Sequence, residues 1–345
     1  MSGIRKIGLL TGGGDCPGLN PVIRAVTRRA IMGGLEVIGI KNGWEGLVKK
    51  IAIPLTLESV SGILPKGGTI LGTSRTNPYK QAEDLRHLKE NFSALQLDAL
   101  IAVGGEDTLG VAVKLIKEGY KVVGIPKTID NDLSNTDYTF GFDTSVNVAM
   151  EAIDRLHTTA ESHHRIMVIE VMGRHAGWIA TCAGIAGGAD AILIPEEPID
   201  MTSICDVIRK RHARGKDFSI IVVAEGARFQ DGSVVAKEEK KDAFGHVRLG
   251  GIGHVLGDRI EEATGFETRV TVLGHIQRGG SPTAFDRILG TRFGVKAAEL
   301  VLAGDFGKMV SLQSNKIVTV PLDERAVAMK TVDPEFYGIA KIFFG

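Results

Sequence analysis

The sequence predicts an α/β fold with mostly parallel sheets that are flanked by helices. Two observations support this prediction. Short apolar runs, typical of buried strands, alternate with helical patterns along almost all of the 345 residues. Polar, Gly-rich turns follow several of these runs, as expected where parallel strands end at a ligand-binding edge. These turns lie at 11–15, 104–108, 126–132 and 172–177.

Each expected element is assigned from its local pattern. Strands are apolar runs bounded by turn residues, and helices are longer segments with apolar residues three and four positions apart. The stretch 227–251 interrupts the alternation, carries the charged run 237–242, and is interpreted as a solvated insertion. In chain order we expect strand 4–10, helix 18–32, strands 37–40 and 99–103, helix 108–118, strand 122–125, helix 144–162, strand 166–171, helix 178–186, strand 191–194, helix 201–213, strand 219–224, strand 269–273 and helix 285–303.

Bulk composition excludes several classes of function. The chain has 41 basic and 41 acidic residues, which argues against nucleic acid or a membrane surface as a partner. Cys16, Cys182 and Cys205 are few, odd in number and far apart, so neither a disulfide framework nor a CxxC metal site is expected. No apolar run approaches membrane-spanning length. These observations favour a cytoplasmic protein.

The segment 126–132 places a cation, a hydroxyl and two carboxylates directly after an apolar run. One of the two carboxylates, Asp130 or Asp132, could take a proton from a hydroxyl group while Lys127 holds a phosphate, and Thr128 supplies the hydroxyl of this segment. This combination is typical of phosphoryl transfer. The alternative is that both aspartates only make turn hydrogen bonds with the backbone.

The Gly-rich turn at 11–18 follows the first expected strand. We expect its backbone N–H groups, around Gly13, to face phosphate oxygens. The turn lacks the Gly-Lys-Ser/Thr of a P-loop, and Pro17 replaces the last glycine of a dinucleotide fingerprint. A tight turn that only packs strand against helix is the alternative.

A second glycine pair, Gly104-Gly105, precedes two acids. Thr108 is expected to cap the helix that follows, and Glu106 and Asp107 exceed what a cap requires. Because Mg²⁺ is usually bound by one or two protein carboxylates and phosphate oxygens, a magnesium site is predicted here.

Several arginines near the ends of expected strands suit bidentate binding of phosphate. A single surface arginine such as Arg75 would not by itself indicate a site. His275 is interpreted as a hydrogen bonder to substrate, and Glu225 ends an expected strand. The remaining arginines are Arg165, Arg174, Arg269 and Arg278.

Taken together, these motifs resemble the 6-phosphofructokinase family over most of the chain. The resemblance implies two lobes with the active site in the cleft between them. The phosphoryl-donor lobe would comprise 1–141 and 278–328, and the fructose 6-phosphate lobe 142–277 with the insertion 227–251. Residues 329–345 would form a C-terminal extension.

The resemblance also implies roles for individual residues in the Mg²⁺-dependent phosphorylation of fructose 6-phosphate. Asp130 would be the base and Glu106 the magnesium ligand. Arg165 and Arg269 would reach a neighbouring subunit's site, so a homodimer or homotetramer is expected. The phosphoryl donor would contact Gly13, Arg75, Gly105 and Thr108, and the sugar phosphate would contact Thr128, Ile129, Met172, Gly173, Arg174, Glu225, His275 and Arg278.

Two positions favour pyrophosphate as the phosphoryl donor. Family members that use ATP generally have glycine where Asp107 and Lys127 stand. A carboxylate at Asp107 would repel the α-phosphate of ATP by roughly 4 kcal/mol at about 4 Å, whereas pyrophosphate has no α-phosphate. An ATP-dependent enzyme and a non-catalytic sugar-phosphate sensor are the alternatives, and a NAD or lipid kinase is disfavoured by the motifs at 172–175 and 273–282.

The bacterial ATP enzymes of the family carry an effector site for nucleotide diphosphate and phosphoenolpyruvate. Its expected cations are matched by Arg24, Arg28, Arg214 and Lys216, whereas Ile51 and His157 replace arginines. We therefore expect little allosteric control.

Overall fold

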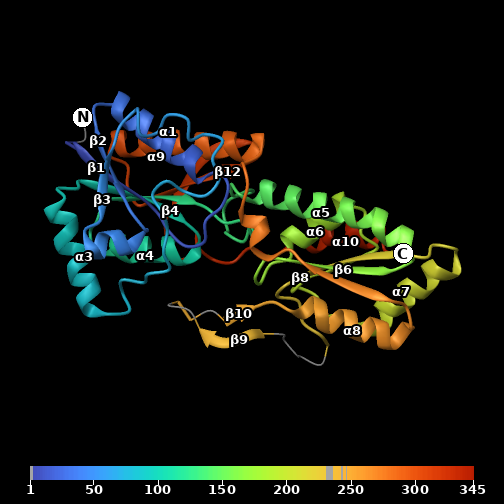
Figure 1. Cartoon of the computed structure of the whole chain (residues 1–345). Coiled ribbons are helices and arrows are strands. Elements are labelled where there is room, and N and C mark those ends of the chain that lie inside the picture. Colours follow the sequence, from blue (N-terminus) through green and yellow to red (C-terminus); the bar gives the residue numbers. More distant parts are fainter. Residues whose placement is uncertain (1–2, 231–235, 242–243, 246) are drawn as a thin grey trace.

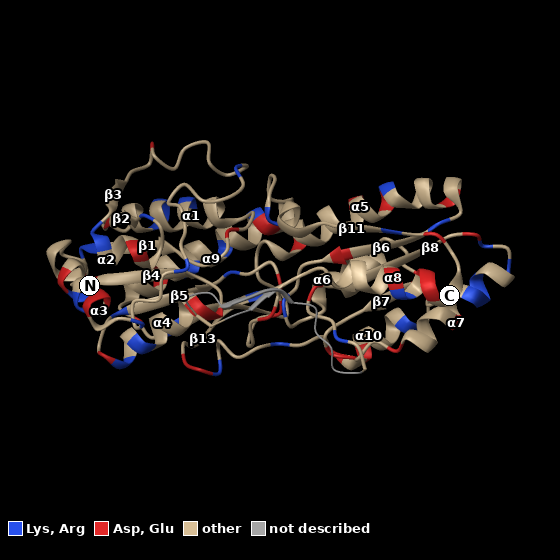
Figure 2. Cartoon of the chain, turned by 60° about the horizontal axis from the view of Figure 1, so that its bottom comes forward, with Lys and Arg blue, Asp and Glu red and all other residues tan. Residues whose placement is uncertain are grey.

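The computed structural model describes residues 3–230, 236–241, 244–245 and 247–345. It contains two lobes, each built around its own sheet, and they lie next to each other along one long axis (Figure 1). This arrangement agrees with the predicted fold class. Basic and acidic residues are interspersed over both lobes (Figure 2). Among the residues described, no helix is both long and apolar enough to span a membrane.

The first sheet has the strand order β13-β12-β5-β4-β1-β2-β3. Its inner strands run parallel, and β3 and β13 close the two edges in antiparallel orientation. Helices α1 and α9 cover one face, and α3 and α4 lie below the other (Figure 1). The elements are β1 (Lys6–Thr11), α1 (Leu19–Met32), β2 (Glu36–Ile40), α2 (Trp44–Lys49), β3 (Ala52–Leu55), α3 (Ala82–Ala94), β4 (Ala99–Gly104), α4 (Glu106–Lys117), β5 (Val122–Pro126), α9 (Ala284–Ala303), β12 (Lys308–Gln313) and β13 (Lys316–Pro321).

The second sheet is parallel throughout, in the order β11-β6-β8-β7. Helices α5, α6 and α10 cover one face, and α7 and α8 cover the other (Figure 1). Its elements are α5 (Phe142–His163), β6 (Ile166–Val171), α6 (Trp178–Ala186), β7 (Ala191–Leu193), α7 (Met201–Ala213), β8 (Ser219–Ala224), α8 (Ile252–Thr264), β11 (Thr268–Val272), the short 3₁₀ helix η1 (Gly274–Arg278) and α10 (Pro334–Lys341).

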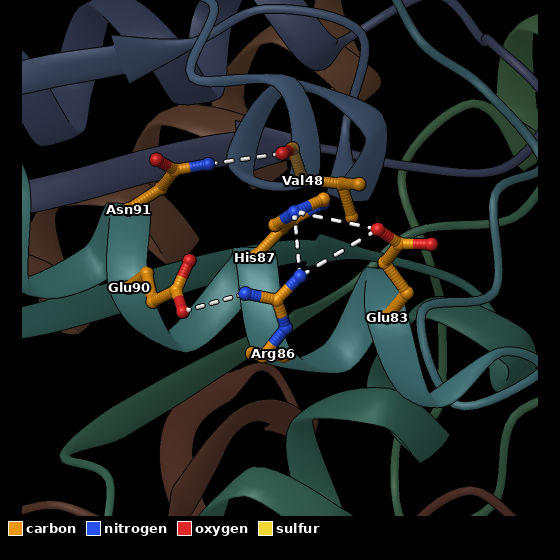
Figure 3. Close-up of polar contacts among 6 residues, drawn as sticks. All are labelled: Val48, Glu83, Arg86, His87, Glu90 and Asn91. Atoms are coloured by element: carbon orange, nitrogen blue, oxygen red, sulfur yellow. Dashed lines mark hydrogen bonds and ion pairs between the residues drawn. The ribbon is translucent and has the colours of Figure 1, made fainter.

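Each strand and helix predicted from the sequence is present, with small shifts at the ends. The elements that were not predicted are mostly short or polar. Helix α3 is an example, because only Leu88 and Phe92 of its thirteen residues are buried. Its exposed face is stabilised by ion pairs of Arg86 with Glu83 at 3.5 Å and with Glu90 at 3.2 Å (Figure 3). Two buried apolar residues give too weak a periodicity for this helix to be predicted from the sequence.

The predicted insertion 227–251 is only partly described, because residues 231–235, 242–243 and 246 lie outside the described residues. Its described part includes β9 (Ala236–Lys241) and β10 (Val247–Leu249), which pair antiparallel to each other. No strand was predicted here from the sequence.

The two lobes are joined where α5 and α9 begin. The carboxylate of Asp286 on α9 accepts hydrogen bonds from the backbone N–H of Thr144 at 2.8 Å and from its hydroxyl at 2.5 Å. Thr283 donates a hydrogen bond to Asp143 at 2.6 Å. These contacts fix the first turn of one helix against the first turn of the other. They lie close to the predicted lobe boundaries at 141 and 278.

Candidate active site

The candidate active site is a cavity at the carboxyl ends of β1, β4 and β5. These strands are adjacent in the first sheet, so the loops that follow them converge. Arg174 and Arg278 close the cavity from the segments that follow β6 and β11. The lining residues are Gly13, Gly14, Arg75, Gly105, Glu106, Asp107, Thr108, Lys127, Thr128, Asp130, Asp132, Arg174 and Arg278. Gly14 was not singled out from the sequence, although it lies in the predicted Gly-rich turn, and Asp132 was expected beside Asp130.

Lys127 is the buried cation of this cavity, with only 3% of its surface exposed. Its ammonium group donates a hydrogen bond to the backbone carbonyl of Gly14. Burial lowers the pKa of Lys127, and the nearby positive charge of Arg278 lowers it further. A cation that is held away from water in this way is a strong partner for an anion that enters the cavity.

The Gly-rich turn after β1 does not present its N–H groups as predicted. The N–H of Gly12 donates to the carbonyl of Val103 at 2.9 Å, and that of Gly13 donates to the carbonyl of Ser74 at 3.1 Å. The prediction that these N–H groups face a phosphate was therefore wrong for Gly12 and Gly13. The turn binds its neighbouring backbone, and Lys127 supplies the positive charge beside it.

Helix α4 begins earlier than predicted, at Glu106, with Gly105 as its N-cap residue. Thr108 is therefore not the cap. It is buried within the first turn and lies against Gly104, where an added Cβ atom would be 2.3 Å from the Cβ atom of Thr108. Glu106 and Asp107 thus occupy the first helical turn, where the helix dipole stabilises negative charge. Both line the cavity.

Asp130 and Asp132 lie in a tight turn after β5. Asn131 between them has a φ of 52°, and its side-chain oxygen accepts a hydrogen bond from the N–H of Thr139 at 3.1 Å. Asp130 is 3% exposed, and its Oδ1 atom is buried without a hydrogen-bond partner among the described residues. Burial and the charge of Asp130 raise the pKa of Asp132 to about 7. Asp130 also lines the cavity, together with Asp132 and Arg174.

On the side of the second sheet, the turn after β6 carries Gly173 and Arg174. Gly173 has a φ of 144° and Arg174 a φ of 50°, so this turn is in a backbone conformation that few residue types adopt. The N–H of Arg174 donates to Glu225 at 3.3 Å. Burial, followed by the charge of Asp130, raises the pKa of Glu225 to about 7. Glu225 therefore lies against the turn that carries Arg174.

Gln277 supports the same turn and was not among the residues predicted from the sequence. It is fully buried, accepts a hydrogen bond from the N–H of Met172 at 2.8 Å, and donates one to Ser145 at 3.3 Å. It lies within the motif 273–282, so the signal was present in the sequence. A single glutamine among arginines and glycines does not by itself indicate a structural role in the site.

Seven predicted site residues do not line this cavity in the single chain: Met172, Gly173 and Glu225, which form or contact the turn after β6, and Ile129, Arg165, Arg269 and His275. Ile129 is fully buried behind it, and His275 is exposed on η1. Arg165 and Arg269 lie where β6 and β11 begin, and both form ion pairs with Glu267, Arg165 at 2.9 Å. The cavity is at the other end of these strands, which is about 15–20 Å away for five or six residues.

The cations that match the expected effector site do not gather within one chain either. Arg24 and Arg28 lie on α1 in the first lobe, whereas Arg214 and Lys216 follow α7 at the far end of the second lobe (Figure 1). His157 is in hydrogen-bond contact with the carbonyl of Gly187 at 2.8 Å.

The cavity is suited to a Mg²⁺ site in which the protein supplies few of the ligands. Among the residues described, no group of three or more His, Cys, Asp or Glu side chains could hold a metal ion. Mg²⁺ commonly takes one or two carboxylates and completes its coordination with phosphate oxygens and water. Glu106 on the cavity wall, in the first turn of α4, agrees with that kind of site.

Comparison with known proteins agrees with this geometry. A family model described as phosphofructokinase matches residues 6–301. The pyrophosphate–fructose 6-phosphate 1-phosphotransferase of Streptomyces coelicolor is 57% identical over 99% of this chain and 100% of that protein. The ATP-dependent 6-phosphofructokinase 3 of the same organism is 49% identical over 97% of this chain and 99% of that protein. The T-state phosphofructokinase of Pichia pastoris superimposes with a TM-score of 0.84 at 33% identity, covering 99% of this chain and 37% of that chain. The chain belongs to the phosphofructokinase family.

Proposed function

We propose that the protein is a pyrophosphate–fructose 6-phosphate 1-phosphotransferase, which reversibly converts fructose 6-phosphate and pyrophosphate to fructose 1,6-bisphosphate and phosphate. The observation that carries this proposal is the presence of Lys127 and Asp107 in one cavity with Asp130. Similarity to the Streptomyces coelicolor phosphotransferase over nearly the whole length of both chains supports it.

Asp130 is the proposed base. Its carboxylate would accept the proton of the sugar hydroxyl on C1, and the hydroxyl oxygen would then attack the terminal phosphorus of pyrophosphate. The bond from that phosphorus to the bridging oxygen breaks, and inorganic phosphate leaves. The buried ammonium of Lys127 would stabilise the negative charge that gathers on the departing phosphate.

The second lobe would position the sugar. Arg174 and Arg278 line the cavity and would bind phosphate oxygens, and Glu225 would accept a hydrogen bond from the sugar. Met172 and Gly173 would shape the turn that approaches it. His275 is proposed to contact the sugar phosphate from η1.

Mg²⁺ is the proposed cofactor, held by Glu106, and it would neutralise charge on the transferred phosphoryl group. Gly13, Arg75, Gly105 and Thr108 would surround the phosphoryl donor. Thr128 and Ile129 would hold the backbone beside Asp130, since the Thr128 hydroxyl accepts a hydrogen bond from the Asp130 N–H at 3.0 Å.

Arg165 and Arg269 are proposed to complete the active site of a neighbouring subunit, in a homodimer or homotetramer. Their separation from this chain's own cavity supports that assignment.

We also propose a cytoplasmic location. The proposal is supported by the cysteine pattern, since the three cysteines are few and far apart in the sequence and all three are free in the structure.

The experiment that tests the phosphoryl donor supplies fructose 6-phosphate and Mg²⁺ with either pyrophosphate or ATP. We expect kcat/KM to be at least a hundredfold higher with pyrophosphate, because Asp107 repels the α-phosphate of ATP by a few kcal/mol. The ATP-dependent relative makes ATP the second candidate donor. Equal efficiency with ATP would contradict the proposal.

Variants of Asp107 and Lys127 test whether these two residues determine the use of pyrophosphate. Asp107→Gly should weaken the use of pyrophosphate, and Lys127→Met should lower its kcat/KM by about a hundredfold, since a buried charge-assisted contact is lost. Lys121→Met, on the neighbouring exposed surface before β5, is the control and should leave kcat/KM unchanged.

A further inference from the structure

Residues 328–332, which we call the strap, lie beyond the 6–301 that the family model matches. The strap pairs with the end of the turn that carries Asp130 and Asp132. The N–H of Lys330 donates to the carbonyl of Asp132 at 2.8 Å, and the N–H of Ser134 donates to the carbonyl of Ala328 at 3.0 Å. Leu133 and Met329 form an antiparallel bridge between these two contacts. The strap therefore acts as a short added strand behind the proposed base.

The side chain of Lys330 reinforces this pairing. Its ammonium group donates to the carbonyls of Thr136 and Asp137 at 2.9 and 3.0 Å. The same ammonium lies 5.2 Å from the centre of the Trp178 ring, within the range of a cation–π interaction. The ammonium group thus makes two hydrogen bonds to the turn 131–139 and also lies within cation–π range of an aromatic ring.

The strap also makes hydrogen bonds to the second lobe. The indole N–H of Trp178, the first residue of α6, donates to the carbonyl of Lys330 at 3.1 Å. The N–H of Val332 donates to Glu196 at 2.9 Å, and the same carboxylate accepts the N–H of Gly177 at 3.0 Å. Trp178 and Gly177 directly follow the turn that carries Arg174. The strap therefore connects the turn of the proposed base to the turn of the proposed sugar-binding arginine.

We propose that Lys330 is a positioning residue for phosphoryl transfer, which holds Asp130 and Arg174 at a fixed separation through the strap. This inference rests on the proposed function of the cavity. The attacking hydroxyl belongs to a substrate that the second lobe binds, while its proton goes to a carboxylate on the first lobe. A small change in the separation of the lobes would spoil that alignment, and misplacement by about 1 Å can cost a hundredfold in rate.

The test compares Lys330→Met with Lys341→Met in the full-length protein. Lys341 also lies in the C-terminal region and over an aromatic ring, 4.9 Å from the centre of Tyr337, but it pairs with Glu197 on the surface. We expect Lys330→Met to lower kcat about tenfold or more with pyrophosphate, while KM for both substrates changes less than twofold. Lys341→Met should match the wild type in both parameters.

Two further variants separate positioning from folding. Lys330→Arg keeps a charged hydrogen-bond donor and should retain kcat within about threefold. Trp178→Phe keeps the aromatic ring but removes the indole N–H; it should lower kcat, and combining it with Lys330→Met should produce less than the product of the two separate effects. Thermal unfolding of each variant shows whether it is folded at the assay temperature, and if Lys330→Met is not, Trp178→Phe carries the test.

The outcomes distinguish this inference from the proposed function. If the wild type does not turn over pyrophosphate and fructose 6-phosphate, the proposed function is wrong. If the wild type is active and folded Lys330→Met has an unchanged kcat, the inference is overturned. It is also overturned if Lys330→Arg is as impaired as Lys330→Met, or if the loss is confined to KM.

Discussion

Asp130 combines burial with an unpartnered carboxylate oxygen, which is a costly state for a group with a structural role alone. We predict that Asp130→Asn lowers kcat by 10²–10⁴-fold, the range that a general base typically contributes, with little change in the affinity for fructose 6-phosphate. Calorimetric titration of the sugar phosphate and steady-state assays measure the two effects. Asp137→Asn, on the exposed side of the same loop, is the matched control. A folded Asp130→Asn variant with normal turnover would rule out this base.

Glu225 makes the stability of the protein depend on pH. Burial and the charge of Asp130 raise its pKa from 4.5 to about 7, so between these values the folded protein keeps a proton that the unfolded chain has lost. The free energy of unfolding therefore falls as the pH rises through this window. Glu225→Gln removes the titration and should gain up to about 3 kcal/mol relative to the wild type between pH 4.5 and pH 8.

Denaturant unfolding of both proteins across this pH range checks the prediction. Asp132 and Asp286, whose pKa values are also raised, are present in both proteins, so they largely cancel in the difference. A difference that does not vary with pH would show that Glu225 titrates at an ordinary value.

At the scale of elements, Thr283 is the N-cap of α9 and is also bound to the start of α5. Its hydroxyl accepts the N–H of Asp286 at 3.3 Å and donates to Asp143. Thr283→Ala should lower the free energy of unfolding by about 1–2 kcal/mol, because the cap and the contact between the helices are both lost. Thr283→Ser keeps the hydroxyl and should lose much less. Equal losses in the two variants would assign the effect to the methyl group.

How well each strand or helix could be predicted from the sequence depends on how much of its length is buried. The strands β4, β5, β6 and β8 are buried along their whole length, and apolar runs of that kind are visible in the sequence. Edge strand β13 is only partly buried, and its alternation is weak. The capping role assigned to Thr108 failed because two glycines and two acids were all compatible with a helix start. Local sequence alone did not decide between them.

The site was predictable to the extent that parallel strands gather their carboxyl ends. Lys127, Thr128 and Asp130 follow β5, and Glu106 follows β4, so adjacency in the sheet brings them together. Contacts that depend on the C-terminal region were not predictable in this way. The pairing of Lys330 with Asp132 links residues that are nearly two hundred positions apart and follows no local pattern.

At the scale of the whole molecule, the distance of Arg165 and Arg269 from the cavity predicts active sites that are shared between subunits. Asp130→Asn and Arg269→Ala should each be nearly inactive alone. Hybrid oligomers formed by dissociation and reassembly of a mixture should recover activity, to about a quarter of the wild type for random dimers, because one site per hybrid has both native residues. Hybrids that form but stay inactive would place both residues in the same site.

The two tryptophans of the chain occupy different lobes, which provides an intrinsic optical probe. Trp44 is buried in the first lobe with 1% exposure, whereas Trp178 is stacked 6.2 Å from Phe336 and lies beside the strap. Replacing Trp44 with Phe would leave a single indole at the junction that connects the two halves of the cavity. Its fluorescence would then respond to ligand-induced rearrangement of that junction without any attached label. Rapid-mixing experiments could use this signal to measure the rate of lobe movement.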